Sequence, residues 1–153
     1  MKVKIRRIKT KAEEQVVIEC VEITPAVESI YSYVLTKGTE LSGVENGRIC
    51  KFELEDVCYF EAMDEKLFAY TESRVFEMKA RLYEVEEAYK GYHFIRCSKS
   101  MVLNLMQLSG ISPALNGRFW GHMKNGEKIS ISRQYVPALK AAVMVEKEGG
   151  KEA

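Results

Sequence analysis

Short runs of β-branched and aromatic residues recur along the chain and predict many short strands with few helices. Two such runs, at 3–8 and 16–23, lie on either side of the polar stretch 10–15 and predict two strands joined by a short loop. Thr24-Pro25 is a helix start signal, and apolar positions then repeat at helical spacing from Val27 to Val34, up to Lys37-Gly38. We therefore expect residues 1–40 to form a β-β-α extension, whose amphipathic helix must pack on the next module or on another chain.

From residue 41 onward the pattern changes to short strands joined by turns. Asn46-Gly47 and Asn125-Gly126 are hairpin signals between β-prone segments. The strand-like runs are 41–45, 49–52, 57–60, 67–71, 75–78, 94–96, 101–103, 106–111, 119–123 and 128–132, and helical spacing occurs at 82–89 and from 136. Residues 41–145 are thus predicted to be one mainly β (α+β) domain, followed by a disordered tail at 146–153.

Composition narrows the class of protein. In 153 residues, 46% hydrophobic and 29% charged content is ordinary for a globular chain, and no run reaches the ~18 apolar residues of a membrane span. The charged N-terminus lacks the apolar core of a secretion signal, so we expect a cytoplasmic protein. Four scattered cysteines and two histidines show no metal-ligand spacing and no catalytic constellation, which predicts no cofactor and no enzyme activity.

Charge is segregated along the chain although the formal net charge is only +1. Residues 56–90 carry five Lys/Arg against nine Asp/Glu, whereas residues 91–145 carry seven Lys/Arg against the single acid Glu127. Such segregation points to a polyanionic partner for the C-terminal third, with a merely solvated surface as the alternative. No pair of long basic helices is predicted, so a helix-turn-helix is not expected and any nucleic-acid contact must come from loops.

The stretch 94–104 carries the most informative chemistry. An apolar pair enters it, a polar cluster from Arg96 to Ser100 follows, and Met101 to Leu103 return toward a core. This order predicts a strand, a tight loop and a second strand. Cations and hydroxyls at a loop tip suit a phosphate backbone, because Arg and Lys neutralise its charge and Ser donates a neutral hydrogen bond.

Several ordered patterns over residues 45–143 resemble the LytTR-type DNA-binding domain of bacterial response regulators. They are Tyr59-Phe60-Glu61, Leu82-Tyr83-Glu84, residues 94–100 with 102–104, residues 125–127, and residues 129–133 with Tyr135 and Leu139-Lys140. The resemblance implies an antiparallel β fold whose loops enter successive major grooves, reading direct repeats at promoters, often as a homodimer. The chain departs from the family's response regulators because no phosphoacceptor receiver domain is visible. It resembles the stand-alone regulators, which are often encoded beside a small membrane protein that modulates them.

By this resemblance Lys99 and Arg133 face base edges, whereas Ser100 and the helix start at Arg81 contact phosphates. Ser98-Lys99 stands where many members carry a histidine with arginine or asparagine, so no base preference can be transferred. On charge and on resemblance together, the residues expected at the DNA interface are Lys66, Arg81, Arg96, Ser98, Lys99, Ser100, Lys128, Arg133 and Tyr135.

Each expected contact has a plainer alternative. Lys99 can be a solvated lysine, Arg133 an ion pair capping the last helix, and Arg96 a salt bridge to Glu61 or Glu84. Tyr135 can be a core aromatic, and Asn104 is interpreted as a turn former. Cys97 lies between two cations, which would lower the pKa of its thiol and suit redox sensing, but a small packed side chain is the preferred interpretation.

Two functions remain compatible with the sequence. The first is a sequence-specific DNA-binding transcriptional regulator. The second is a non-catalytic protein-interaction module that keeps the fold without DNA binding, acting through the N-terminal helix or the acidic 56–90 region.

Overall fold

The computed structural model describes the backbone of residues 1–152 and the side chains of residues 1–144. The α-helices are α1 (Pro25–Lys37), α2 (Leu82–Ala88) and α3 (Val136–Glu152). The strands are β1 (Glu40–Glu45), β2 (Arg48–Glu53), β3 (Tyr59–Met63), β4 (Lys66–Tyr70), β5 (Val75–Met78), β6 (Phe94–Ser98), β7 (Met101–Asn104), β8 (Leu108–Pro113), β9 (Phe119–Met123) and β10 (Lys128–Ile131). Short 3-10 turns are η1 (Lys11–Glu13), η2 (Leu54–Asp56), η3 (Leu105–Gln107), η4 (Leu115–Gly117) and η5 (Arg133–Tyr135).

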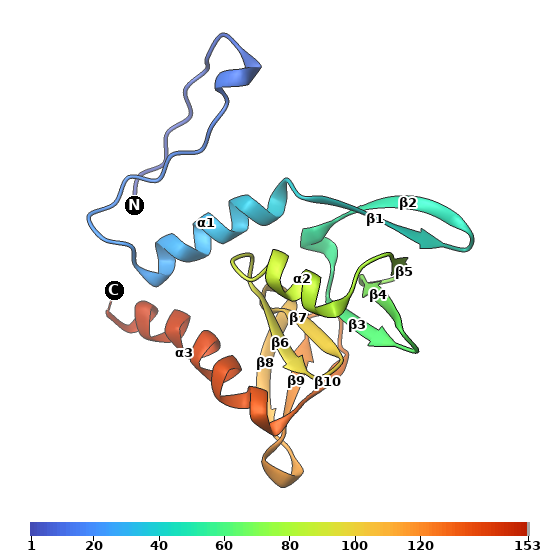
Figure 1. The fold of residues 1–153 in the computed structure, drawn as a ribbon. Coiled ribbons are helices and arrows are strands. Elements are labelled where there is room, and N and C mark those ends of the chain that lie inside the picture. The colour runs from blue at the N-terminus through green and yellow to red at the C-terminus, as the bar shows by residue number, and fades with distance from the viewer. Residues whose placement is uncertain (153) are drawn as a thin grey trace.

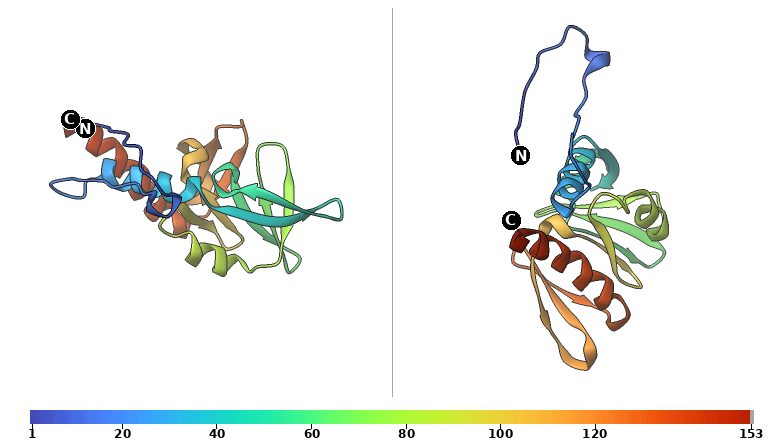
Figure 2. Two further views of the ribbon diagram at one scale, coloured as in Figure 1. Left: turned by 90° about the horizontal axis from the view of Figure 1, so that it is seen from above. Right: turned by 90° about the vertical axis from the view of Figure 1, so that its left-hand side faces the viewer.

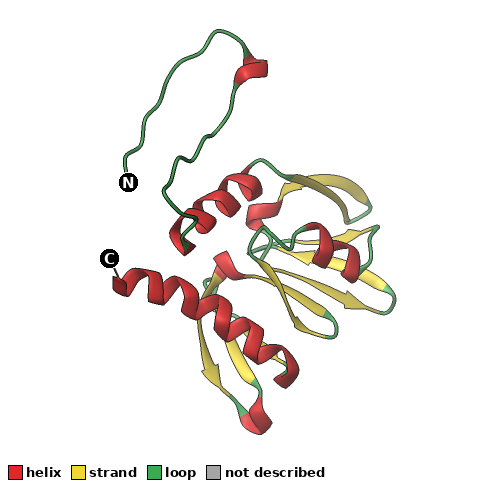
Figure 3. Cartoon of the chain, turned by 60° about the vertical axis from the view of Figure 1, so that its left-hand side comes forward, coloured by secondary structure: helices red, strands yellow, loops and turns green. Residues whose placement is uncertain are grey.

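The strands form two antiparallel sheets (Figures 1 and 3). The larger sheet has the order β2-β1-β5-β4-β3-β7-β6, and the smaller one has the order β10-β9-β8. The mainly β class with short helices is therefore confirmed, and the two Asn-Gly hairpins form where they are predicted, β1–β2 and β9–β10.

Two apolar clusters cover the two faces of the large sheet. On one face Phe60 and Val102 pack with Leu82 and Val85 of α2. On the other face the second cluster joins β3, β6 and β7 to the small sheet and α3; its buried members are Cys58, Tyr59, Cys97, Leu103, Met123, Ile129, Ile131, Val136 and Leu139. Strands β3 and β7 are thus buried on both faces, which makes them the rigid centre from which the loops project.

The two strands predicted at 3–8 and 16–23 are wrong: apart from η1, residues 1–24 have no regular structure in the described chain. They form an arm that projects from the N-terminal end of α1 (Figures 1 and 2). Val3, Ile5 and Val21 are exposed there, because no neighbouring strand supplies backbone hydrogen bonds or covers the apolar face.

At the other end of the chain α3 continues to Glu152, where the sequence predicts a disordered tail from residue 146. The predicted α1 is confirmed with its Thr24 cap, whose hydroxyl accepts a hydrogen bond from the Val27 backbone N–H at 3.3 Å. Within the described residues, no helix combines the length and hydropathy that crossing a bilayer requires.

Candidate nucleic-acid interface

A β-bulge shapes the turn between β6 and β7. Arg96 pairs with Val102 and Ser98 pairs with Met101, so Cys97 is the extra residue of the bulged strand. Its side chain is fully buried in the second cluster, and its carbonyl accepts a 2.9 Å hydrogen bond from the Ser132 backbone N–H. This bond ties the β6–β7 turn directly to the chain that leads into η5.

The Arg96 guanidinium braces the same turn from inside. Nε donates to the Ser98 carbonyl and Nη2 to the Lys99 carbonyl, both at 2.7 Å, and Nη1 lies 3.0 Å from the Glu86 carboxylate. The predicted ion pair is therefore formed, but with Glu86 rather than with Glu61 or Glu84. With three donors occupied within its own chain, Arg96 holds the turn in shape and links it to α2.

The tip of this turn presents the groups that the sequence singles out. The Ser98 hydroxyl accepts a hydrogen bond from the Ser100 backbone N–H at 3.2 Å, and the two hydroxyls lie 3.4 Å apart. Lys99 is exposed, and its amine has no ion pair among the side chains of residues 1–144. The tip therefore offers a cation beside hydroxyl groups, held on a rigid backbone.

Arg133 begins η5 immediately after Ser132. Its methylenes lie over Gly117 of η4: a Cβ added at Gly117 would fall 2.7 Å from Arg133 Cδ, and Gly117 has a φ of +75°. Glycine is required there for both reasons. No carboxylate pairs with Arg133 in the described part of the chain, so the helix-capping ion pair is not formed and the guanidinium is exposed to an outside acceptor.

The β3–β4 turn lies at the same end of the large sheet. The Ala62 backbone N–H donates to the Ser100 carbonyl at 2.8 Å, which places this turn beside the β6–β7 turn. Lys66 follows the carboxylates Asp64 and Glu65, and its amine lies 3.5 Å from Glu77. The β3–β4 turn is therefore less cationic than the β6–β7 turn and the segment that begins at Arg133.

Arg81 starts α2 at this end of the sheet as well, because β5 runs antiparallel to β4 with Met78 opposite Leu67. The Arg81 backbone N–H donates to the Glu84 carboxylate at 2.9 Å, which caps the helix and leaves the arginine side chain exposed. The structure thus brings together seven of the nine expected residues: Lys66, Arg81, Arg96, Ser98, Lys99, Ser100 and Arg133. We call this group the loop edge.

The other two expected residues stand apart. Lys128 is at the start of β10, so roughly 13 Å of strand separates it from Ser132. Its amine lies 4.4 Å from the centre of the Trp120 ring. Tyr135 is half-buried and packs against the second cluster, in agreement with its interpretation as a core aromatic.

Two cations near Arg133, Arg118 and Lys140, were not among the residues expected at the DNA interface. Arg118 follows η4, and its Nε lies 3.4 Å from the Leu115 carbonyl. The Lys140 amine lies 5.2 Å from the centre of the Phe119 ring, and Phe119 pairs with Ile131 at the end of β10. Lys140 and Phe119 are far apart in the sequence, so no local signal predicts this placement.

Asn104 and Cys97 are both buried and structural. Asn104 donates from Nδ2 to the Val57 carbonyl at 2.8 Å and accepts from the Met106 N–H at 3.0 Å, which confirms the turn-forming interpretation. The lowered pKa expected for Cys97 is wrong: burial raises the pKa of its thiol to about 12, more than the neighbouring Arg96 lowers it. A packed side chain, the preferred interpretation, describes Cys97.

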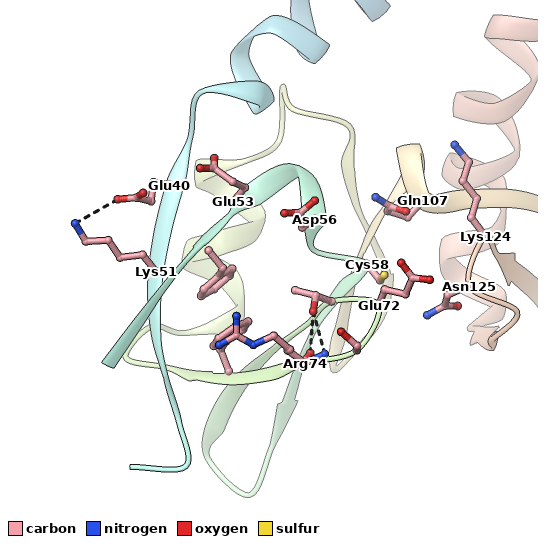
Figure 4. A pocket seen from close by; sticks show the side chains of 14 residues that line it. Glu40, Lys51, Glu53, Asp56, Cys58, Glu72, Arg74, Gln107, Lys124 and Asn125 are labelled. Carbon is pink, nitrogen blue, oxygen red and sulfur yellow. Dashed lines mark hydrogen bonds and ion pairs between the residues drawn. The ribbon is translucent and has the colours of Figure 1, made fainter. Parts of the chain in front are cut away.

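The opposite end of the large sheet carries a different surface, a cleft of about 520 Å³ (Figure 4). Its lining includes the acids Glu40, Glu53, Asp56 and Glu72 interspersed with the cations Lys51, Arg74 and Lys124. Near this end the Tyr59 hydroxyl donates to Glu127 at 3.0 Å, and burial together with this bond raises the pKa of Tyr59. A polyanion would meet carboxylates here, so the loop edge is the better surface for one.

Comparisons with known proteins identify the family of the domain. The sequence model of the LytTr DNA-binding domain matches residues 47–144. A protein of Staphylococcus aureus strain COL, described as an uncharacterized HTH-type transcriptional regulator, is 28% identical over 137 residues, covering 88% of this chain and 92% of its own. A counterpart in strain MRSA252 with the same description is 27% identical over the same length.

A solved LytTr DNA-binding domain from Bacillus cereus has a TM-score of 0.65 and 25% identity, covering 69% of this chain and 96% of that domain. The relatives' names mention a helix-turn-helix, whereas here β-strands separate α1, α2 and α3 along the described chain. The alignment with the relatives covers 137 residues, which is more than this chain contains from residue 47 to its end. The alignment therefore includes part of the segment that precedes residue 47.

Proposed function

The chain belongs to the LytTr DNA-binding domain family, and from this premise we propose that it is a sequence-specific DNA-binding transcriptional regulator that reads major-groove direct repeats through loops. The observation that carries the proposal is the loop edge. There the Cys97–Ser132 hydrogen bond joins the large sheet to the small one and holds two exposed cations, Lys99 and Arg133, on adjoining turns of the two packed sheets. Loops on a scaffold buried on both faces are suited to a fixed register on DNA.

The residues divide into two roles. Arg133 presents a planar fork that can donate to guanine O6 and N7 together, and Lys99 can donate to the same acceptors as a point charge. Ser100 and Arg81 lie where neutral and charged donors meet phosphate oxygens. Arg96 is a positioning residue, since it bonds to the turn that carries Lys99.

The finer features of the proposal come from the family resemblance. We include a homodimer on promoter direct repeats, a cytoplasmic location, the absence of catalytic activity and modulation by a small membrane protein.

The alternative, an interaction module without DNA binding, is favoured by one observation. Two acids of the 56–90 region, Asp56 and Glu72, line a cleft away from the loop edge together with Glu40 and Glu53, and a basic protein segment would find complementary charge beside them. Association with such a partner would persist while duplex binding is absent at low salt.

Selection from random duplexes tests the proposal. The purified chain is incubated with a random library, bound fragments are sequenced, and the enriched duplex and a scrambled copy are titrated at several salt concentrations. We expect one enriched motif and an affinity that falls with salt, with a log–log slope of about −0.9 for each phosphate neutralised. No enrichment, together with no duplex shift at the lowest salt, would contradict it.

A further inference from the structure

The N-terminal arm, residues 1–23, leaves its apolar side chains uncovered. Ile5 is 96% exposed, Val3 87%, Val21 106% and Ile23 73%. These values contrast with the domain, where Tyr59 and Phe60 of β3 and Val102 and Leu103 of β7 are buried. Exposed apolar side chains that recur at alternating positions of one segment mark an interaction surface rather than a solvated one.

The arm has the pairing pattern of a β-hairpin. If Lys11 to Gln15 form the turn, Val3 falls opposite Ile23 and Ile5 opposite Val21 on one face. The same register sets Arg7 opposite Glu19 on that face, while Lys4 falls opposite Glu22 and Ile8 opposite Ile18 on the other. Shifting the register by one residue puts Val3 opposite Glu22 and removes this match. The two limbs already run in opposite directions on either side of η1 (Figure 1).

A second uncovered apolar surface lies in the same chain, between α1 and α3. It is a groove of about 760 Å³ whose lining includes Ile30 and Tyr33 of α1, Leu108 of β8 and Val143 of α3. Strand β8 is an edge of the small sheet, so its outer side has no strand neighbour among the described residues.

The arm of the same chain does not line this groove, because none of the residues that line it comes from 1–24. Thr24 has extended backbone (φ −88°, ψ 166°) and Pro25 begins α1, so the arm leaves from the helix N-terminus, loops outward around η1 and turns back toward the start of α1 (Figures 1 and 2). One chain therefore carries a donor surface and an acceptor surface that do not meet within it.

We propose that two copies of this chain associate by exchanging these arms. Residues 3–23 of each copy fold into the hairpin, and its face with Val3, Ile5, Val21 and Ile23 seats in the α1–α3 groove of the second copy. A twofold axis uses each donor and each acceptor once, and the assembly closes as a dimer. This deepens the homodimer included in the proposed function, while DNA contact by a single loop edge does not depend on it.

Sedimentation of the full chain over a concentration series tests the dimer. We expect twice the 17.5 kDa chain mass, and at least a tenfold weaker association for Ile5→Glu combined with Val21→Glu and, separately, for Ile30→Glu. Ile49→Glu is the matched control: Ile49 is 83% exposed on β2, outside both surfaces, and should dimerise like the parent. Circular dichroism verifies that each variant keeps its fold. A parent monomer at all concentrations, or equal weakening by the control, overturns the proposal.

A charge exchange tests the register. Arg7→Glu and Glu19→Arg should each weaken the dimer, and the double variant should restore it, because the opposite charges face one another again. A double variant weaker than either single variant overturns the hairpin register. Duplex binding by each variant at a concentration where it is monomeric separates the two proposals: retained binding by a monomer leaves DNA recognition standing when arm exchange fails.

Discussion

The N-terminal arm and the domain from residue 40 to 144 are built from the same kind of sequence, yet only the domain forms strands. Val3-Lys4-Ile5 in the arm and Lys128-Ile129-Ser130-Ile131 in β10 both alternate apolar and polar residues. In β10 the apolar positions are buried and the backbone pairs with β9; in the arm neither occurs. Alternation therefore specifies a strand only where a second strand and an apolar surface are available.

The domain and the arm therefore have different roles. The domain supplies rigidity, so its loops hold donors in fixed places, and the arm supplies surface that a second copy can cover. Changes in one region should leave the other largely untouched, and the following substitutions test that separation.

The largest effect is expected from a cavity in the domain. Phe60→Ala, at a fully buried position of β3, should lower the free energy of unfolding by about 3–5 kcal/mol. Val21→Ala, at a fully exposed arm position, should change it by no more than ~0.5 kcal/mol in dilute solution. Urea unfolding followed by Trp120 fluorescence measures both. Similar losses for the two variants would show that the arm packs on its own domain.

Arg133→Ala should cost about 1–3 kcal/mol of binding to the selected duplex, because a bidentate contact to a base edge is lost. Binding to scrambled duplex should fall much less. Fluorescence anisotropy with both duplexes gives the ratio, and Lys128→Ala, at the start of β10 and away from the loop edge, is the control. Equal losses on both duplexes for Arg133→Ala would remove its role as a base reader.

Arg96→Met should weaken all duplexes by roughly tenfold, comparable to ~1.5 kcal/mol for one hydrogen bond to a charged group. The change releases the Ser98 and Lys99 carbonyls, so the turn no longer holds its shape. Arg96→Lys should not restore binding, because a lysine cannot donate to two carbonyls and a carboxylate in this fork. Anisotropy under the same conditions measures it, and full rescue by lysine would assign Arg96 a purely charge-based role.

Stability should also depend on pH. Folding raises the pKa of Cys97 to about 12 and also raises that of Tyr59, so the native state holds protons that the unfolded state loses first. This contribution to the free energy of unfolding is fully present below pH ~9, the ordinary thiol pKa. It is lost as the pH rises toward the pKa values of the folded state, and each group loses at most about 1.4 kcal/mol per pH unit. Urea midpoints at pH 8, 9.5 and 10.5 should fall less for Cys97→Ala than for the parent. Parallel pH profiles of the two proteins would contradict this.

The domain was largely predictable because its signals are local. Asn46-Gly47 takes the left-handed conformation of a tight hairpin, with φ of 51° and 76°, which these two residue types adopt at low cost. The strand at 75–78 has the predicted bounds, since turn residues and β-branched runs mark both ends. The grouping of Lys99 with Arg133 came from the family resemblance, and the fold brings their turns together.

The role of each cation could not be predicted from the sequence. Arg96, Lys99 and Arg133 are all cations beside turns, yet Arg96 turns inward to two carbonyls and Glu86 while the other two face outward. The β-bulge at Cys97 decides this, because it buries the thiol and aims the carbonyl at Ser132. A bulge depends on the partner strand, and no feature of residues 94–100 alone marks it.

The sequence by itself determined the turns, the strand and helix positions of the domain, and which segments carry charge, because backbone preference and side-chain alternation act over a few residues. The tertiary structure alone decided which carbonyl each donor meets and which surface stays uncovered. Cys97 and Ser132 are far apart along the chain, and the arm has the pattern of strands but no neighbour in its own chain. Hydrogen bonds and burial require a partner, and partners are set by the whole fold.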